Sequence, residues 1–375
     1  MKALIFGCAL AAALTAAAPP AAAHPPDLGH QVLGPNDGWA ADGTGTTGGS
    51  AADAAHTSTV HDRAGLVAAL DGGSAVPKII YVDGTVDAND GFGAEQYRDP
   101  GYDLASYLAT YDPAVWGRAP LTGPLEEARV RSQKNQAARV VLPVGANTTI
   151  VGLGRHARIV GGDLTLKNVD NVIIRNLEFQ DAYDYFPAWD PTDGSTGNWN
   201  SQYDTVTLTG ATHVWVDHCT FDDGARPDST SPVYFGQRYQ HHDGLLDITK
   251  VSDLVTVSWN RFTEHDKTML IGSSDSATAD NGHLRVTLHD NLFDGVFQRA
   301  PRVRYGQVHA YNNLYAAGGA DYVYSWGVGV SSHLYAENNA FVAAPDFDPA
   351  LVAHAYGGTA LHATGTELNG RPVDV

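Results

Sequence analysis

The sequence predicts an all-β protein, a single-stranded right-handed parallel β-helix with long loops on one side. Three observations support this fold class. Six segments fit one eight-residue template that has apolar residues at its first and third positions and an aromatic residue at its eighth. The aromatic residues recur at intervals of 42, 41, 31, 22 and 26 residues, so a basic spacing is lengthened by insertions. The sixth position is asparagine in the last four segments. The segments are 172–179, 214–221, 255–262, 286–293, 308–315 and 334–341.

A repeat of this length is typical of a solenoid, in which each coil contacts only its neighbours. Because alternate residues of a strand face the same side, the first and third positions of stacked copies would form one continuous core. The recurrent asparagines can stack at a bend, where their amides reach the backbone of neighbouring coils, so we interpret them as structural. A β-sandwich is the alternative, but its hairpins would give shorter and less variable spacings.

The N-terminal region is expected to be an export signal followed by an irregular segment. Lys2 precedes a run rich in Ala and Leu, and the Ala-rich residues 21–23 form an A-x-A cleavage site. We therefore predict a signal peptide at residues 1–23, a secreted, extracellular protein, and one β-helix domain over residues 24–375. Residues 24–60 are rich in Gly, Ser, Thr and Ala, which is typical of a loop.

Two further elements precede the repeats. The run KIIYV at 78–82, closed by Asp83 and Gly84, predicts a strand. A helix is expected over residues 124–136, because a proline stands at its start and Glu126 and Glu127 fall in its first turn. Beyond Arg139 one short strand follows another, each ended by Gly or Asn.

Charge and cysteine content exclude several classes of protein. The chain has 23 Lys and Arg against 42 Asp and Glu, a net charge of −19, which argues against nucleic acid or an anionic membrane as a partner. No segment after the signal reaches the roughly 18 apolar residues of a membrane span. Of the two cysteines, Cys8 lies in the signal, so Cys219 remains alone and no internal disulfide is expected. We expect a monomer.

Long insertions between the repeats are the candidate functional loops, because long structureless loops in a compact domain are usually functional. The longest span 181–202 and 222–242. Carboxylates occupy the earlier coils and cations the later ones. If the coils stack in register, these groups meet on one face.

Among the carboxylates, Asp204 opens a predicted strand, and Asp243 and Asp247 flank a short apolar pair. Carboxylates brought together repel unless a divalent cation compensates them, and ligands that are all oxygen favour Ca²⁺ or Mg²⁺ over zinc. His241 and His242 do not make zinc the better choice, because adjacent residues of a strand face opposite sides. The alternative is a set of solvated surface acids in an acidic chain.

Arginines cluster in a protein that has few cations. Arg299, Arg302 and Arg304 lie within six residues, and Arg302 and Arg304 share a face because they are two apart. A basic cluster on an acidic protein indicates a negatively charged ligand, either carboxylated or phosphorylated. Ion pairing with the excess acids is the alternative.

At these residues the sequence resembles the pectate lyases, and specifically the extracellular Bacillus type, over nearly the whole chain that follows the signal. The blocks that carry the resemblance are VWVDHCTF at 214–221, HHDG at 241–244, HDK at 265–267 and RAPRVR at 299–304. It implies that Asp204, Asp243 and Asp247 bind Ca²⁺. It further implies that Arg299 is the catalytic base, assisted by Lys267 and Arg304, which bind substrate.

The resemblance implies β-elimination of α-1,4-linked polygalacturonate to 4,5-unsaturated products. Free arginine has a pKa above about 12, so we expect activity to rise into the alkaline range, where deprotonated base is more plentiful. Three rivals remain. A polygalacturonase would hydrolyse the polymer with carboxylates, a pectin lyase would take methyl-esterified polymer without calcium, and a binding solenoid would have no turnover.

Overall fold

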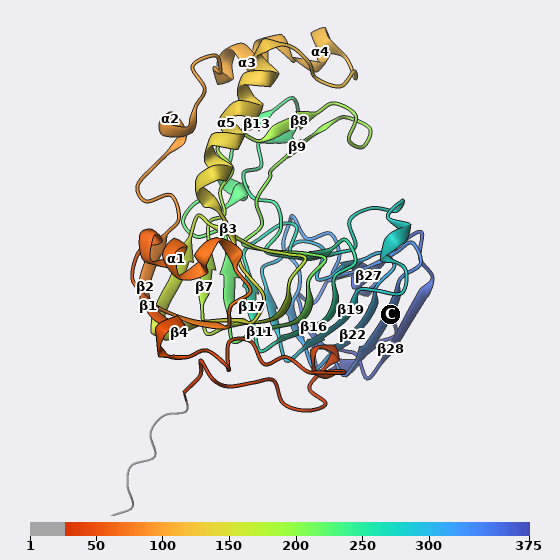
Figure 1. The fold of residues 1–375 in the computed structure, drawn as a ribbon. Helices are drawn as coiled ribbons and strands as arrows, with labels where there is room; N and C mark the ends of the chain where they lie inside the picture. Colours follow the sequence, from red (N-terminus) through yellow and green to blue (C-terminus); the bar gives the residue numbers. More distant parts are fainter. Residues whose placement is uncertain (1–26) are drawn as a thin grey trace, which may run out of the picture.

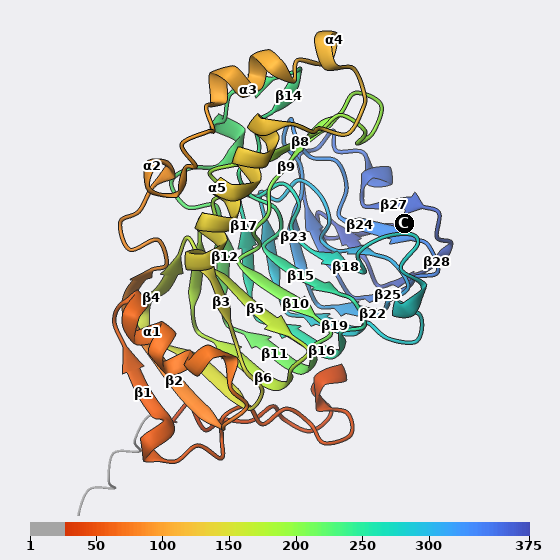
Figure 2. The same cartoon turned by 45° about the horizontal axis from the view of Figure 1, so that its top comes forward.

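Short parallel strands, stacked coil upon coil, make up the body of the molecule (Figures 1 and 2). The computed structural model describes residues 27–375, so the predicted signal peptide at 1–23 lies outside the described residues. Each complete coil adds one strand to a small sheet and two to a large one. The predicted right-handed parallel β-helix is confirmed.

The small sheet has eight strands, and every neighbouring pair is parallel. From the N-terminal end of the solenoid its strands are β3 (Val141–Pro143), β5 (Asp163–Lys167), β10 (Val206–Thr209), β15 (Leu246–Thr249), β18 (Leu270–Ile271), β21 (Arg302–Val303), β24 (Trp326–Gly329) and β27 (Ala353–Tyr356). The register is continuous, with Leu164, Val206 and Leu246 side by side in three successive coils. Residues at equivalent positions of successive strands therefore lie side by side in this sheet.

In the large sheet each repeat is a pair of strands joined by a bend. The break falls at the fifth template position, where φ lies between 51° and 57° in all six repeats. Such left-handed residues tolerate Asn, Asp and His better than other side chains, and four of the six are Asn or Asp. The strand pairs are β6 (Asp170–Arg175) and β7 (Glu178–Gln180), β11 (Thr212–Asp217) and β12 (Thr220–Asp222), β16 (Asp253–Ser258) and β17 (Arg261–Thr263), β19 (Arg285–His289) and β20 (Leu292–Asp294), β22 (Gln307–Tyr311) and β23 (Leu314–Ala316), and β25 (His333–Glu337) and β26 (Ala340–Val342).

The predicted asparagine ladder follows each bend. The Oδ1 atoms of Asn291, Asn313 and Asn339 each accept from the backbone N–H and the Nδ2 of the asparagine one coil earlier, at 2.9–3.1 Å. In the first of the four, Asn260, Oδ1 accepts from the Cys219 N–H at 2.8 Å. Each Nδ2 also donates to a backbone carbonyl of the preceding coil. The four side chains are buried, so the ladder satisfies polar groups that would otherwise be unpaired in the core. They are Asn260, Asn291, Asn313 and Asn339.

Aromatic residues at the eighth template position form the centre of the core. Six rings stack face to face from coil to coil, with centroids 4.5–5.1 Å apart. The rings are Phe179, Phe221, Phe262, Phe293, Tyr315 and Phe341. Burial of this column supplies much of the apolar area that stabilises the solenoid.

The large sheet continues beyond the six repeats at both ends. At its start lie β1 (Thr57–Val60), β2 (Lys78–Asp87) and β4 (Thr148–Val160), and at its end β28 (Ala360–Thr364), β29 (Glu367–Leu368) and β30 (Arg371–Pro372). The strand predicted at 78–82 is thus confirmed but is longer. In the last coil Thr366 and Leu368 stand where earlier coils have asparagine and an aromatic ring.

A lobe of helices and hairpins stands over one side of the solenoid (Figure 1). The predicted helix is α5 (Pro124–Val140), four residues longer than expected, with Arg139 in its last turn. It lies with α2 (Ala94–Tyr97), α3 (Leu104–Thr110), α4 (Pro113–Trp116) and the hairpins β8 (Ala188–Asp190)–β9 (Asn198–Asn200) and β13 (Val233–Tyr234)–β14 (Gln237–Arg238). Its own core is aromatic, with Tyr107, Trp189 and Trp199 buried together. The remaining helix, α1 (Arg63–Leu70), packs on β2.

The loop predicted over residues 24–60 is irregular up to residue 56, but its last four residues form the strand β1, which pairs with β2. Residues 27–56 contain only short 3₁₀ turns at Trp39–Ala41 and Ala54–His56. This segment crosses the large sheet, where the N–H of Ala40 donates to Thr256. Cys219 is buried and free. Within residues 27–375, no helix combines the length and the apolar character that a bilayer-spanning segment needs.

Candidate active site

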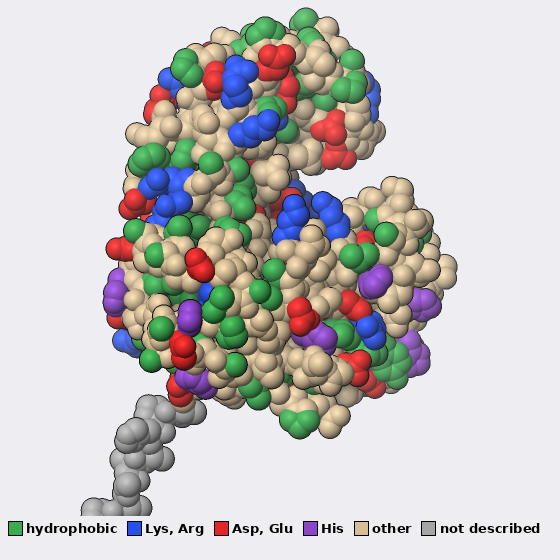
Figure 3. Space-filling view, viewed as in Figure 1, with side chains coloured by type: hydrophobic (Ala, Val, Ile, Leu, Met, Phe, Trp, Pro, Cys, Tyr) green, Lys and Arg blue, Asp and Glu red, His purple; other side chains and the backbone are tan. Residues whose placement is uncertain are grey.

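Four of the six predicted site residues lie at one edge of the small sheet, just before its strands begin. Asp204, Asp243, Lys267 and Arg299 each stand two or three residues before β10, β15, β18 and β21, respectively. Asp247 is the second residue of β15. Figure 3 shows that the surface is hollowed between the helical lobe and the solenoid, and that Lys and Arg side chains gather on the solenoid side of the hollow.

The three aspartates meet around Gly244. The N–H of Gly244 donates to Asp204 Oδ1 at 2.8 Å. A Cβ added to Gly244 would lie 2.5 Å from Asp247 Oδ1 and 2.9 Å from Asp204 Oδ1, so both carboxylates face this glycine. The third carboxylate, Asp243, belongs to the preceding residue and accepts from Lys267 Nζ at 2.9 Å. The structure thus brings together three aspartates from two coils and a lysine from a third.

Two of these carboxylates are buried without a cationic partner. Asp204 and Asp247 are 7% and 9% exposed, and neither forms an ion pair with a described residue. Burial, followed by the charge of Asp243, raises the pKa of Asp204 to about 7. Burial and the charge of Asp204 raise the pKa of Asp247 well above its ordinary value. Solvated surface acids, the alternative considered from the sequence, do not describe this pair.

The donor set fits a hard divalent cation. All three side chains offer carboxylate oxygens, the ligands that Ca²⁺ prefers, and two of them, although buried, form no ion pair with a residue in 27–375. In the described part of the chain, no three acidic, histidine or cysteine side chains already surround one point closely enough to hold a metal, since Asp243 is turned to Lys267. The fit therefore rests on donor chemistry and uncompensated charge.

A fourth acid, which the sequence did not indicate, adjoins this group. Asp163 on β5 is buried, and its Oδ1 lies 3.0 Å from the hydroxyl of Thr207, which is also 2.9 Å from Asp204 Oδ2. Burial and then the charge of Asp204 raise the pKa of Asp163 well above its usual value. Only its place at the start of an apolar strand could have suggested it.

Arg299 is held in an unusual backbone conformation. Its φ is 60°, in the left-handed region, which costs a non-glycine residue about 1–2 kcal/mol. Adjacent coils fix it, because Met269 N–H donates to the Arg299 carbonyl and Ala300 N–H to the Ser325 carbonyl, both at 2.8 Å. The side-chain Nε is buried without a hydrogen-bond partner in the described structure. Strained residues of this kind concentrate at functional sites.

The other arginines have different surroundings. Arg304 pairs with Asp275 at 2.6 Å and makes no ion pair with the three aspartates among the described residues. The Arg302 guanidinium lies 4.1 Å from the centre of the Tyr356 ring. Burial lowers the pKa of Arg302, and the charges of Arg304 and Arg299 lower it further. Ion pairing thus accounts for Arg304 but not for Arg299.

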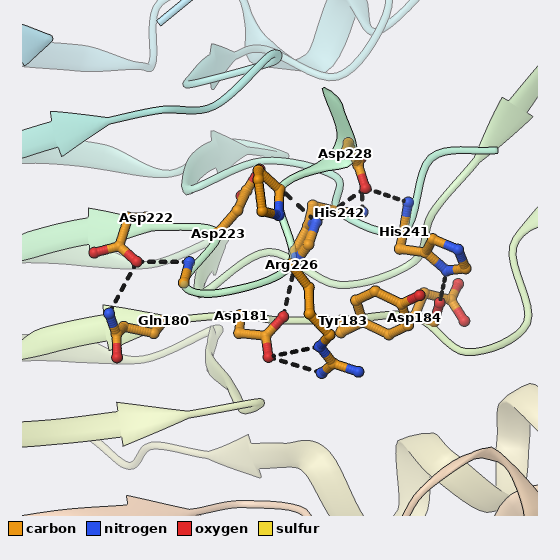
Figure 4. Close-up of polar contacts among 12 residues, drawn as sticks. Gln180, Asp181, Tyr183, Asp184, Asp222, Asp223, Arg226, Asp228, His241 and His242 are labelled. Carbon is orange, nitrogen blue, oxygen red and sulfur yellow. Dashed lines mark hydrogen bonds and ion pairs between the residues drawn. The ribbon is translucent and has the colours of Figure 1, made fainter. Parts of the chain in front are cut away.

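A buried ion network supports the site from the loops that precede it (Figure 4). His242 lies between Asp181 and Asp228, with nitrogen–oxygen distances of 3.1 Å on both sides. Arg226 also pairs with Asp181, at 2.7 Å. Burial alone would lower the pKa of His242, but Asp223, Asp181 and Asp228 raise it to about 10. The loops at 181–186, 222–228 and 240–243 are thereby tied together.

The long insertion 181–202 belongs to the framework that supports the site and supplies none of the three aspartates. Asp184 is buried and accepts from Gln133, Phe186 and Gln202. Trp189 and Trp199, the two tryptophans of the insertion, are in the aromatic core of the helical lobe. His241 stacks on Tyr183, with ring centres 4.1 Å apart, and bonds to the Asp184 carbonyl.

Comparison with known proteins places these features in one family. The family model described as pectate lyase matches residues 121–361. A pectate lyase of Bacillus subtilis (strain 168) is 53% identical, covering 100% of this chain and 90% of the relative. Pectate lyase E of Dickeya dadantii (strain 3937) is 39% identical over 81% of this chain and 67% of its own length. A solved pectate lyase bound to a hexasaccharide, 53% identical, superposes with a TM-score of 0.90 over 93% of this chain and 90% of its own.

Proposed function

The chain belongs to the pectate lyase family, and on this premise we propose that it cleaves de-esterified pectin, α-1,4-linked polygalacturonate, by Ca²⁺-dependent β-elimination. It is a polysaccharide lyase by its family. One observation carries the proposal beyond the family: among residues 27–375, Asp204 and Asp247 are buried without an ion pair, and the strained Arg299 on a neighbouring coil also forms none. Such a site suits an anionic substrate that brings carboxylates to the cations.

Asp204, Asp243 and Asp247 would hold the calcium ion. When bound, Ca²⁺ supplies positive charge that neutralises a uronate carboxylate and so makes the adjacent carbon-bound proton more acidic. The three aspartates suit this task because they come from two neighbouring coils, and the carboxylates of Asp204 and Asp247 both face Gly244. Their roles stay predictions.

Three cations, Arg299, Lys267 and Arg304, would carry out the proton transfer and bind the substrate. Arg299 would take the proton from carbon 5, and the electron pair left on that carbon would form the double bond to carbon 4 as the glycosidic oxygen leaves and takes a proton from solvent water. Lys267 and Arg304 would bind the uronate carboxylate and stabilise the negative charge that develops on it. The hydrogen bond from Lys267 to Asp243 keeps its ammonium beside the aspartates.

The test is removal and return of the metal. The ultraviolet absorbance of the unsaturated uronate product should appear with polygalacturonate, disappear with EDTA and return with excess Ca²⁺. Initial rates should rise from neutral into alkaline pH. Full activity in EDTA would contradict the calcium assignment, and new chain ends without ultraviolet absorbance would indicate hydrolysis.

We also propose that the protein is exported as a monomer, supported by the signal-like residues 1–23. The mature chain purified from culture medium should begin at His24 by mass spectrometry, and its mass in solution should be that of one chain. A protein retained in the cell with residues 1–23 intact would contradict the proposal.

A further inference from the structure

His265 lies beneath the aspartate group and touches it through the backbone. Its Nδ1 is 2.6 Å from Asp223 Oδ1, and its Nε2 is 2.8 Å from the carbonyl oxygen of Asp243. His265 and Asp223 are only 2% and 3% exposed. Since a carbonyl oxygen can only accept, Nε2 must carry a proton and donate it to Asp243.

The Asp243 carbonyl and the Gly244 N–H belong to one trans peptide group, so they point in opposite directions. On the side opposite His265, this N–H donates to Asp204 Oδ1 at 2.8 Å. One peptide plane therefore joins the buried histidine to one proposed calcium ligand, and it is also the backbone of another, Asp243.

We infer that Asp223 and His265 form a positioning relay that orients the Asp243–Gly244 peptide and thereby sets the calcium affinity of the site. The inference rests on the proposed function, because it concerns the proposed calcium ligands. His265 touches neither substrate nor metal in this account and acts only through the peptide.

Two contacts and one steric restriction keep the relay rigid. Asp223 lies between His265 and His242, whose Nδ1 is 3.8 Å from its second oxygen. The backbone of His265 is fixed by the next coil, because Phe297 N–H donates to its carbonyl at 3.0 Å. Gly244 has no room for a side chain on its aspartate-facing side. A peptide held from both sides cannot rotate without breaking the bond to Asp204.

Two isosteric substitutions separate the relay from a general role in folding. In His265→Asn the amide nitrogen replaces Nδ1, so the contact with Asp223 is kept and the donor to the Asp243 carbonyl is lost. In His265→Gln the amide nitrogen replaces Nε2, so that donor is kept and the contact with Asp223 is lost. Both variants disturb the same buried ion pair, and we expect both to lower the unfolding midpoint.

The experiment is calorimetric titration of the EDTA-treated full-length mature protein with Ca²⁺, without substrate. We expect His265→Asn to weaken calcium binding by roughly 10–100-fold, as loss of ligand-orienting hydrogen bonds does at metal sites. His265→Gln should stay within about threefold of the wild type. The exposed His333→Asn serves as the control. Turnover at saturating calcium should fall by less than the affinity does.

Failure of the relay and failure of the calcium assignment give different results. If the wild type binds no Ca²⁺, the assignment of calcium to the proposed function is wrong. If the wild type binds and both His265 variants bind equally well, or lose affinity equally, the relay is wrong. Should His265→Asn not fold, the milder Asp223→Asn, which keeps an acceptor for His265, replaces it and must weaken binding measurably for the relay to stand.

Discussion

Within residues 27–375, Arg299 combines a left-handed backbone with a buried Nε that has no hydrogen-bond partner, and backbone hydrogen bonds to two adjacent coils hold it in place. Neither the left-handed backbone nor the unpaired Nε stabilises the fold, so a function explains them best. We predict that Arg299→Ala lowers kcat by about 10²–10⁴-fold, the usual contribution of a general base.

The control is Arg261→Ala, which removes an exposed arginine paired with Asp294 away from the hollow. Steady-state rates on polygalacturonate, with substrate binding measured separately, check the prediction. Arg299→Ala should retain binding within a few-fold, and undiminished turnover would exclude Arg299 as the base.

Gly244 supports a second prediction. Because a Cβ there would meet Asp204 and Asp247 at 2.9 Å and 2.5 Å, Gly244→Ala must push the carboxylates apart. We expect calcium affinity to fall at least about tenfold while the fold persists. Calcium titration checks this against Gly34→Ala, whose added methyl group would meet nothing within 4 Å. Equal affinities would show that the two carboxylates do not act together.

Among the structural elements, the asparagine ladder is the most regular feature of the solenoid. Asn291 bonds to Asn260, Asn313 and the Val257 carbonyl. Its removal leaves several buried groups unpaired, each worth roughly 1–3 kcal/mol. We predict that Asn291→Gly lowers the free energy of unfolding by at least about 2 kcal/mol more than Asn312→Gly does.

Asn312 is a matched control because it is an exposed asparagine at a bend with φ of 54°, where glycine is tolerated. Urea denaturation of the two variants measures the difference. Equal stabilities would mean that the ladder contributes nothing beyond the bend itself.

Strand positions in the six repeats could be predicted from the sequence because one template encodes both the core and the ladder. The template does not describe the first and last coils. Thr366 and Leu368 replace the template residues in the last coil, and β4 in the first coil is 13 residues long. The break at the fifth position was also missed, because His218 and Trp259 carry no common side-chain signal there.

The site, like the fold, could be predicted from the sequence only in part. Asp204, Asp243 and Lys267 could be placed because strand register carries over from coil to coil. The supporting contacts of Asp163, Asp223, Gly244 and His265 could not, because they depend on how loops fold between strands. The helical lobe likewise required long-range packing of aromatic residues that have no periodic spacing.

At the scale of the whole molecule, we expect buried tyrosines of the helical lobe to limit the stability of the fold at alkaline pH. Burial raises the pKa of Tyr97 and of Tyr102 to about 12, from about 10 in the unfolded chain. Because the folded state holds these protons more tightly, the stability they contribute is complete below pH 10 and is lost between about pH 10 and 12.

We therefore predict that Tyr102→Phe, which cannot ionise, shifts the alkaline unfolding midpoint to higher pH. The matched Tyr335→Phe variant changes a tyrosine that is 42% exposed and should leave the midpoint unchanged. Circular dichroism during a pH titration measures both. Identical midpoints in Tyr102→Phe and the wild type would exclude the buried phenol as a cause of alkaline unfolding.

We propose that the aspartates and arginines at the small-sheet edge break the polymer by elimination and not by addition of water. Mass spectrometry of the products from one oligogalacturonate of defined length distinguishes the two reactions. We expect that every new non-reducing end lacks one water and carries the carbon 4–carbon 5 double bond, and that such ends are absent with Arg299→Ala. Saturated ends that contain the added water would contradict it.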